Sequence, residues 1–221
     1  MVGIPDGFCI DATEVTRSQY AAWLSANPTT TGQVSACTWN DSYTPTCEWP
    51  VGTKGDHPVV CVDWCDAYAY CQAVGKRLCG KIGGGMNSFN DYANASTSQW
   101  YAACTSGGTS DYPYGDTYSG TTCNGYEAGH GTTVPVASMN GCQSAASGYT
   151  GAYDLSGNVW EWEDSCAANT GSSDNCRLRG GSFVGSSGGG GESVLRCDYN
   201  LSNIGRANQL ESVGFRCCSS P

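Results

Sequence analysis

Fifteen cysteines lie between Cys9 and Cys218 of this 221-residue chain, and they constrain its fold more than any other feature. Proteins kept in a reducing compartment rarely carry so many, whereas exported proteins use dispersed cysteines as disulfides that stabilise loop-rich folds. A structural zinc site is the alternative, but the chain has only His57 and His130 and contains no Cys-x-x-Cys pair. The cysteines therefore predict a disulfide-rich fold in an extracytoplasmic compartment, whether secreted, periplasmic or at the cell surface.

The charge of the chain excludes two classes of partner. Ten Lys and Arg residues oppose 20 Asp and Glu residues, and the basic residues form no cluster of the kind that binds phosphates. We therefore expect neither nucleic acid nor an anionic membrane as partner. No apolar run approaches the roughly 18 residues of a transmembrane helix. The start "MVGIPDGFCID" has no basic and apolar signal regions, so an exported chain would be the mature part of a longer precursor. Nothing in the sequence indicates an oligomeric state.

Hydrophobic spacing predicts three short helices and little other regular structure. They span residues from about Thr16 to Leu24, a segment capped by Asp63 and ended by Gly75, and the stretch "STSQWYAAC" at 96–104. A buried strand is predicted at 59–62. Downstream, the runs "VPVAS", "SVLRC" and "VGFRCC" alternate with turn residues and predict small strands and ordered loops. Without a repeat or a linker, residues 1–221 are predicted to form one domain.

Several segments, in this order along the chain, resemble the formylglycine-generating enzyme family, also called the sulfatase-modifying factor domain. They include "GFCIDATEVTRSQYAAWL", "HPVVCVDWCDAYAYCQAVGKRL", "GAYDLSGNVWEWEDS", "RLRGGSF" and "VGFRC". The resemblance spans nearly the whole chain, and the combination of motifs carries more weight than any one of them. It implies an irregular, loop-rich α+β fold of the C-type-lectin-like kind, with a small twisted antiparallel sheet and a few short helices.

The resemblance also implies two disulfides, Cys71–Cys217 and Cys104–Cys197. Each closes a loop of roughly a hundred residues, for which the chain-entropy model expects about 4 to 5 kcal/mol of stabilisation. Proximity in the sequence suggests the pairs Cys37–Cys47, Cys123–Cys142 and Cys166–Cys176, and the remaining proposals are Cys65–Cys79 and Cys9–Cys218. Fifteen is an odd number, and Cys61, in an apolar run, is the predicted unpaired thiol.

The segment "DLSGNVWEW" is the predicted calcium site. The resemblance implies four ligands, with Asp154 and Glu161 offering carboxylates and Gly157 and Val159 offering carbonyls. The alternative is that the Asp and Asn of this segment make local turn bonds and that Glu161 meets an arginine. A second site of the family would begin at Asn124 and Gly125. Its downstream Asp is missing here unless Glu127 replaces it.

The stretch after "RGGS" decides the chemistry. The enzymes of this family carry two copper-binding cysteines there, and alignment from either side places Gly185 and Glu192 at those positions. Soft thiolates hold Cu(I), and neither residue replaces them. The histidine cluster of the iron-dependent relatives is also missing, and His57 and His130 stand alone without an orienting partner in the sequence. We therefore predict no catalytic residue and no formylglycine-generating activity.

Two functions fit this outcome. The first is a binding or structural module that presents residues 183–210 to a peptide, glycan or protein, as the resemblance to variable lectin-like proteins implies. The predicted contact residues are Ser182, Phe183, Glu192, Asp198, Tyr199, Asn200, Asn203 and Asn208. The second is an oxidoreductase that acts on a peptide or metabolite side chain without the cysteine pair. A solvated loop with no partner remains the simpler alternative to both.

Overall fold

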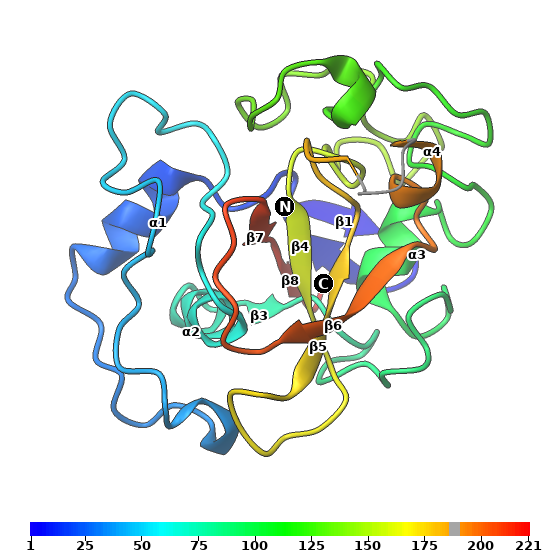
Figure 1. The fold of residues 1–221 in the computed structure, drawn as a ribbon. Coiled ribbons are helices and arrows are strands. Elements are labelled where there is room, and N and C mark those ends of the chain that lie inside the picture. Colours follow the sequence, from blue (N-terminus) through cyan, green and yellow to red (C-terminus); the bar gives the residue numbers. More distant parts are fainter. Residues whose placement is uncertain (186–190) are drawn as a thin grey trace.

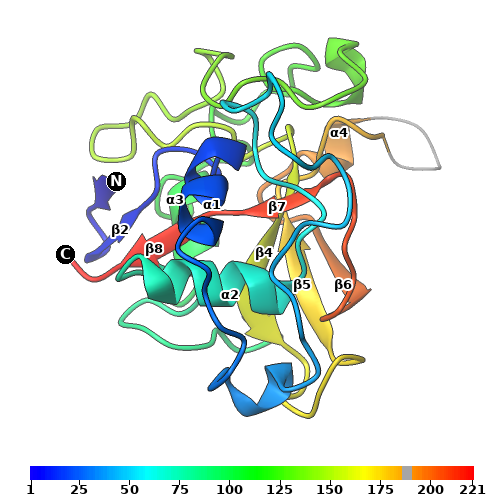
Figure 2. The ribbon, with the colours of Figure 1, turned by 90° about the vertical axis from the view of Figure 1, so that its left-hand side faces the viewer.

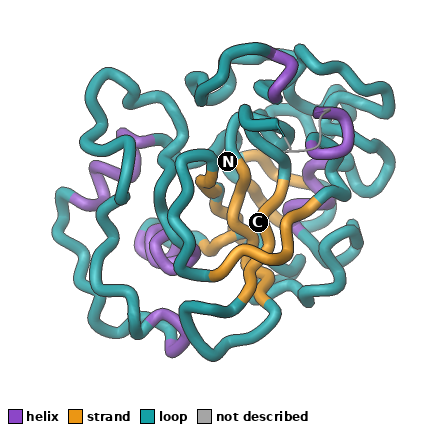
Figure 3. Tube along the Cα trace, in the orientation of Figure 1, coloured by secondary structure: helices purple, strands orange, loops and turns teal. Residues whose placement is uncertain are grey.

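Two small sheets lie at the centre of the fold, and most of the remaining chain is loop and turn (Figures 1 and 3). The computed structural model describes residues 1–185 and 191–221. The first sheet has the order β1-β2-β8-β3 and is antiparallel; its strands are Val2–Ile4, Phe8–Ile10, Cys217–Ser219 and Arg77–Leu78. The second has the order β6-β5-β4-β7; its strands are Asn200–Gly205, Asn175–Arg179, Trp160–Cys166 and Val213–Phe215. The loop-rich α+β fold is confirmed. It has two sheets instead of one, and β4 and β7 run parallel.

The three predicted helices are confirmed, and each begins at a polar cap. Helix α1 spans Arg17–Leu24, α2 spans Trp64–Ala73 and α3 spans Gln99–Cys104. Thr16 and Asp63 form capping boxes with the side chains three residues on, and Ser98 accepts a hydrogen bond from the backbone of Tyr101. Short helical turns also occur at η1 (Ser35–Cys37), η2 (Tyr126–Ala128) and α4 (Gly191–Val194).

The predicted strand at 59–62 is wrong. Backbone N–H groups of this segment donate to loops far away in sequence, from Val59 to Val15 and from Cys61 to Leu210. Cys61 has φ 60°, which takes the chain out of the extended region. "SVLRC" is not a strand either, because its first residues end α4. "VPVAS" forms none, whereas "VGFRCC" supplies parts of β7 and β8.

Aromatic side chains fill much of the core. Tyr20 packs with its ring centroid 5.5 Å from that of Tyr70 and 6.3 Å from that of Phe215. Trp162 is buried and donates its indole N–H to the carbonyl of Val62 at 3.0 Å, and Trp160 is also buried. Both tryptophans of "VWEW" therefore belong to the core, where their large rings bury apolar area.

Four of the seven predicted disulfides are confirmed: Cys71–Cys217, Cys104–Cys197, Cys123–Cys142 and Cys166–Cys176. The two pairs implied by the family resemblance are among them. Seven disulfides indicate that the chain folds in an oxidising, extracytoplasmic compartment. Across residues 1–185 and 191–221, every helix is too short or too polar to cross a membrane.

The predicted pairs Cys37–Cys47, Cys65–Cys79 and Cys9–Cys218 are wrong. The structure instead contains Cys37–Cys65, Cys47–Cys61 and Cys79–Cys218, and the free cysteine is Cys9 rather than Cys61. Helix α2 begins beside η1, which brings the Cα atoms of Cys37 and Cys65 within 5.7 Å. Strand β8 lies between β2 and β3. In this register Cys9 pairs with Ser219 instead of Cys218, whereas Cys218 pairs with Arg77 of β3, two residues before Cys79. Strand pairing thus selects Cys79 over Cys9.

Candidate functional site

The "RGGS" turn is held rigidly against the loop before β4. Gly180 and Gly181 have φ of 88° and 75°, in the left-handed region that glycine adopts without strain. The N–H of Gly157 donates to the carbonyl of Gly180 at 2.8 Å, and the N–H of Phe183 donates to that of Asn158 at 3.1 Å. A Cβ atom on Gly181 would lie 2.8 Å from the carbonyl oxygen of Val194 in α4. The turn therefore fits only glycine there, and it fixes where Phe183 and the following residues begin.

Tyr112 and Glu127 hold α4, where the oxidases of this kind would have their second copper cysteine. The Tyr112 hydroxyl donates to the carbonyl of Glu192 at 3.1 Å, and burial raises the pKa of Tyr112 to about 12. The N–H of Gly191 donates to Glu127 at 3.3 Å. Within residues 1–185 and 191–221, no three His, Cys, Asp or Glu side chains are grouped to hold a metal ion. The arrangement supplies neither thiolates nor a histidine cluster at this position.

An exposed apolar surface lies beside this turn. Tyr126 is 64% exposed and Val184 is 45% exposed. A Cβ on Gly185 would lie 2.8 Å from the Tyr126 ring, so the ring covers the backbone next to Val184. Half-buried Phe183 lines an adjoining cavity of about 120 Å³ together with Arg17, Glu48 and Glu211. We call Tyr126, Phe183 and Val184 the aromatic rim.

The eight predicted contact residues differ in their exposure and in their partners, and their role in binding stays a prediction. Ser182 is buried, and Glu192 is exposed on α4. Asp198 is bound to Arg196, which also makes two 2.7 Å hydrogen bonds to Asp111. Tyr199 packs 6.0 Å from the Trp160 ring, the Asn200 side chain accepts a hydrogen bond from Arg177, and Asn203 and Asn208 are exposed in and after β6. Figure 2 shows α4 and β6 on the same side of the molecule, with α4 above β6. Residues 186–190, which belong to the predicted segment, lie outside the described residues.

Arg216 forms an ion pair with Glu161, one of the two carboxylates predicted to bind calcium. Its guanidinium donates from Nε to both oxygens of Glu161 at 2.9 and 2.8 Å, and from Nη2 to Oε1 at 2.7 Å. Trp100 donates to Oε2 at 2.9 Å. Both oxygens of Glu161 therefore accept hydrogen bonds, and this carboxylate already has a cationic partner in this arrangement. The meeting of Glu161 with an arginine was the alternative that the sequence left open, and calcium binding itself stays a prediction.

Glu14 joins the predicted calcium residues in one buried polar network, although no motif in the sequence pointed to Glu14. Asn158 donates to Glu14 at 2.9 Å and accepts from Asn124 at 3.1 Å, while Asp154 accepts from the N–H of Ala137 at 2.6 Å. One oxygen of Glu14 and one of Asp154 have no hydrogen-bond partner among the described residues. Burial holds the pKa of Glu14 well above its usual range and raises that of Asp154 to about 6. Two buried carboxyls with unpartnered oxygens fit either a shared proton or a hard cation.

The surroundings of Gly125, His57 and His130 are explained by packing, a hydrogen bond and solvent exposure. Gly125 packs against Leu195, where an added Cβ would lie 2.6 Å from a side-chain methyl. His57 shares a 2.9 Å hydrogen bond with Thr133, and burial lowers its pKa. His130 is exposed. Among the described residues, neither imidazole has a carboxylate hydrogen-bonded to it, and the absence of a general-base role stays a prediction.

Asp164 gives a prediction on pH. It is buried beside Gly80 and Asn87, and burial, followed by the charge of Glu163, raises its pKa to about 7. Folding therefore takes up a proton at this carboxyl between about pH 4 and pH 7. We expect its contribution to the free energy of unfolding to fall by roughly 4 kcal/mol as the pH rises through that window. Asp164→Asn should flatten the profile measured by chemical denaturation, and exposed Asp41→Asn should not. Parallel profiles for wild type and Asp164→Asn would contradict this assignment.

Comparison with known proteins places the fold. The model of the "Sulfatase-modifying factor enzyme 1-like domain" family matches residues 2–221. The chain is 29% identical to "Inactive C-alpha-formylglycine-generating enzyme 2" of Mus musculus over 178 residues and of Bos taurus over 177 residues. The matches cover 76% and 75% of this chain but only 50% and 51% of those proteins, so it spans about half of their length.

Three solved structures share the fold over 97% of this chain. CarF is 23% identical with a TM-score of 0.61, and 86% of it is covered. PvdO from Pseudomonas aeruginosa is 20% identical with a TM-score of 0.60, and 80% of it is covered. Treponema denticola variable protein 1 is 22% identical with a TM-score of 0.58, and 84% of it is covered. At these identities the likeness concerns the fold alone.

Proposed function

We propose that this chain is an extracytoplasmic binding module and not a formylglycine-generating oxidase. The chain belongs to the sulfatase-modifying factor enzyme 1-like family. One observation carries the proposal. The two positions of the copper cysteines hold Gly185, which packs under Tyr126, and Glu192, which is exposed on α4. A backbone and one hard carboxylate do not bind Cu(I) as two thiolates do. The names of the relatives from mouse and cattle agree with the absence of this activity.

The aromatic rim is the contact surface in this proposal. Tyr126 and Val184 expose apolar area on a rigid frame, because the "RGGS" turn and the Tyr112 hydrogen bond hold the backbone on either side. Exposed aromatic residues on an ordered scaffold supply contact area at a low entropic cost. Exposed Glu127 and Glu192 lie beside the rim, and the chain has a net charge of −10. The partner that fits is a peptide or protein segment with an apolar side chain next to a basic one.

A peptide library tests this proposal. Random peptides displayed on phage should be enriched by the immobilised protein for segments that combine apolar residues with Lys or Arg. Tyr126→Ser together with Val184→Ser should weaken binding of a selected peptide at least tenfold, because two anchors lose their buried area. Leu210→Ser, the same type of substitution at another exposed apolar residue, should change the Kd of the selected peptide by less than about threefold. Equal losses in both variants, or no enriched sequence, would contradict the proposal.

A structural calcium ion remains part of the proposal, with Asp154 and Glu14 as its carboxylates. The support is a charge imbalance, since three carboxyls, Glu14, Asp154 and Glu161, are buried around Arg216, the one cation near them among the described residues. Asn124 has an unpartnered buried side-chain oxygen in the same network. A cation bound by these hard oxygens would neutralise buried charge and fix the loop that precedes β4. The calcium content of the natively purified protein tests this part of the proposal.

A further inference from the structure

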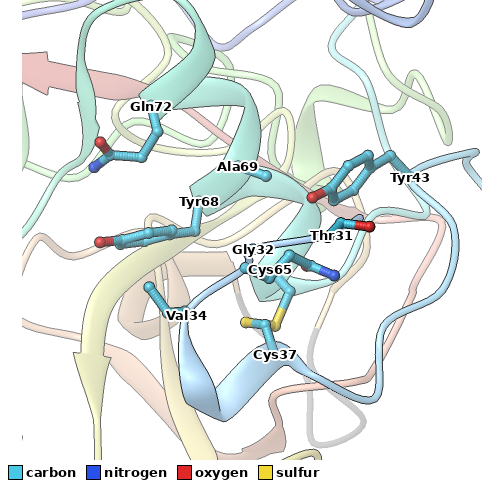
Figure 4. Close-up of a pocket in the computed structure, with 10 residues that line it drawn as sticks. Thr31, Gly32, Val34, Cys37, Tyr43, Cys65, Tyr68, Ala69 and Gln72 are labelled. Carbon is cyan, nitrogen blue, oxygen red and sulfur yellow. A yellow bond between two sulfur atoms is a disulfide. The ribbon is translucent and has the colours of Figure 1, made fainter. Parts of the chain in front are cut away.

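A second cavity lies away from the aromatic rim, between α2 and the loop that leads into η1. Its volume is about 370 Å³, within the range of small-molecule sites. Figure 4 shows Tyr68 and Gln72 extending from α2 on one side, and Thr31 and Tyr43 on the other, with the Cys37–Cys65 disulfide below. In Figure 1, α2 lies on the left of the molecule and α4 on the upper right, so a ligand here would not touch the proposed contact surface.

The lining of this cavity is uncharged. None of its ten residues is Asp, Glu, Lys, Arg or His, in a chain whose net charge is −10. A phosphate, a carboxylate or an ammonium group would therefore be desolvated there without a counter-charge, which is unfavourable. The cavity is not purely apolar either, because two phenols, two carboxamides and a threonine hydroxyl line it together with Val34 and the disulfide. The chemistry fits a neutral ligand that carries both hydroxyls and C–H surface.

Several of the polar groups are available for a ligand. The Tyr68 hydroxyl, the Gln72 carboxamide and the Thr31 hydroxyl make no hydrogen bond within the part of the chain that the structure describes. The aromatic surface is oriented in advance, because Trp64 stacks on Tyr68 with ring centroids 4.9 Å apart and an interplanar angle of 19°. The Tyr68 side chain lines the cavity, and its hydroxyl is left for contact with a ligand.

The walls of the cavity are fixed by covalent and hydrogen bonds. The Cys37–Cys65 disulfide ties η1 to the first turn of α2. Gln33 donates to the carbonyl of Asn40 at 2.7 Å, and Asn40 donates to buried Asp66 at 2.8 Å. Such a site loses little conformational entropy when a ligand binds.

We propose that this cavity is a binding site for a neutral saccharide of one or two pyranose units. Tyr68 and Tyr43 would contact the C–H face of the sugar ring, while Gln72 and Thr31 would hydrogen-bond to its hydroxyls. The inference is independent of the aromatic rim, and either can fail without the other.

Saturation-transfer NMR on the full chain tests the site. The probes are methyl α-D-glucoside, methyl α-D-mannoside, methyl β-D-galactoside, N-acetylglucosamine and their neutral disaccharides. At least one should bind with a millimolar or lower Kd. Glucuronic acid should bind at least about tenfold more weakly than its neutral counterpart, because no basic group lines the cavity.

Two substitutions locate the binding. Tyr68→Ala and Gln72→Ala should each weaken binding of the best probe at least about tenfold, through loss of the ring contact and of the hydrogen bonds. Val74→Ala, at the exposed end of the same helix and outside the cavity, should change the Kd less than twofold. Unchanged thermal unfolding of Gln72→Ala shows that its effect is local. No binding by any probe, equal binding of the charged sugar, or binding that survives both substitutions would overturn the proposal.

Discussion

Removal of Cys71–Cys217 and Cys79–Cys218 together should lower the free energy of unfolding by about 7 kcal/mol, which is of the order of the whole stability of many domains. Taken alone, Cys71–Cys217 spans 146 residues and Cys79–Cys218 spans 139 residues. The two nevertheless close almost the same loop, because Cys217 and Cys218 are neighbours and Cys71 and Cys79 flank the end of α2 and β3. While one is intact, the other closes a ring of only about ten residues, worth about 3 kcal/mol in the chain-entropy model.

Once both are gone, the first one restored closes a ring of about 50 residues that runs through Cys104–Cys197, worth about 4 kcal/mol. The two single cysteine-pair removals should therefore cost about 3 kcal/mol each, and the double removal should cost more than their sum. Guanidinium unfolding of Cys→Ala variants under non-reducing conditions measures these values. Cys166→Ala with Cys176→Ala, which opens an isolated loop of sequence separation 10, is the matched control and should cost about 3 kcal/mol. A double removal that costs no more than this control would contradict the pairing of β3 and β8 with α2.

Arg216→Met should be the most destabilising single side-chain change, by about 4 kcal/mol. Arg216 is fully buried and neutralises Glu161, and the neighbouring Glu14 and Asp154 add to the negative field that holds the pKa of this guanidinium above its usual range. Without it, three buried carboxyls would face one another with no cation. Its loss also frees the carbonyls of Asp11 and Tyr153, which accept hydrogen bonds from its nitrogens at 3.2 and 2.8 Å.

Two further variants separate the cost of leaving a buried charge unpaired from the cost of losing an exposed ion pair. Arg196→Met breaks the ion pairs of Arg196 with Asp111 and Asp198, whose side chains are 34%, 43% and 43% exposed, and should cost about 1 kcal/mol or less. Glu161→Met combined with Arg216→Met should cost less than Arg216→Met alone, because no unpaired partner of this pair remains buried. A double variant that is less stable than the Arg216→Met single variant would contradict the account of this network.

Local signals in the sequence predicted the helices well, because their caps lie within three residues of their starts. Thr16 with Gln19 and Asp63 with Asp66 are examples of such caps. The strand predicted at 59–62 failed because its backbone partners, Val15 and Leu210, lie far away in the chain. An apolar run alone does not distinguish a strand from a buried extended loop.

The polar network shows the same limit at the candidate site. Asn158 and Glu14 are 144 residues apart, and Glu161 and Arg216 are 55 apart, yet each pair is in direct contact. No spacing rule connects such residues, so the sequence could name Glu161 as a candidate ligand but could not show that Arg216 engages it. The two long-range disulfides confirmed by the structure came from the family resemblance, whereas only two of the three pairs suggested by proximity were right. Cys37 joins Cys65 because α2 starts beside η1, which is a property of the fold.

The central claim is that this fold carries a binding surface where formylglycine-generating enzymes carry a copper centre. The most direct test is the metal content of the natively purified protein, measured by mass spectrometry without chelator and again after incubation with Cu(I). We expect no stoichiometric copper or iron in either sample, no oxygen consumption with thiol-containing peptides, and about one equivalent of calcium. A preparation without calcium would leave Glu14 and Asp154 as a pair that shares a proton. One equivalent of copper or iron, with oxygen consumption that Glu192→Ala abolishes, would contradict the claim and make the chain an oxidoreductase.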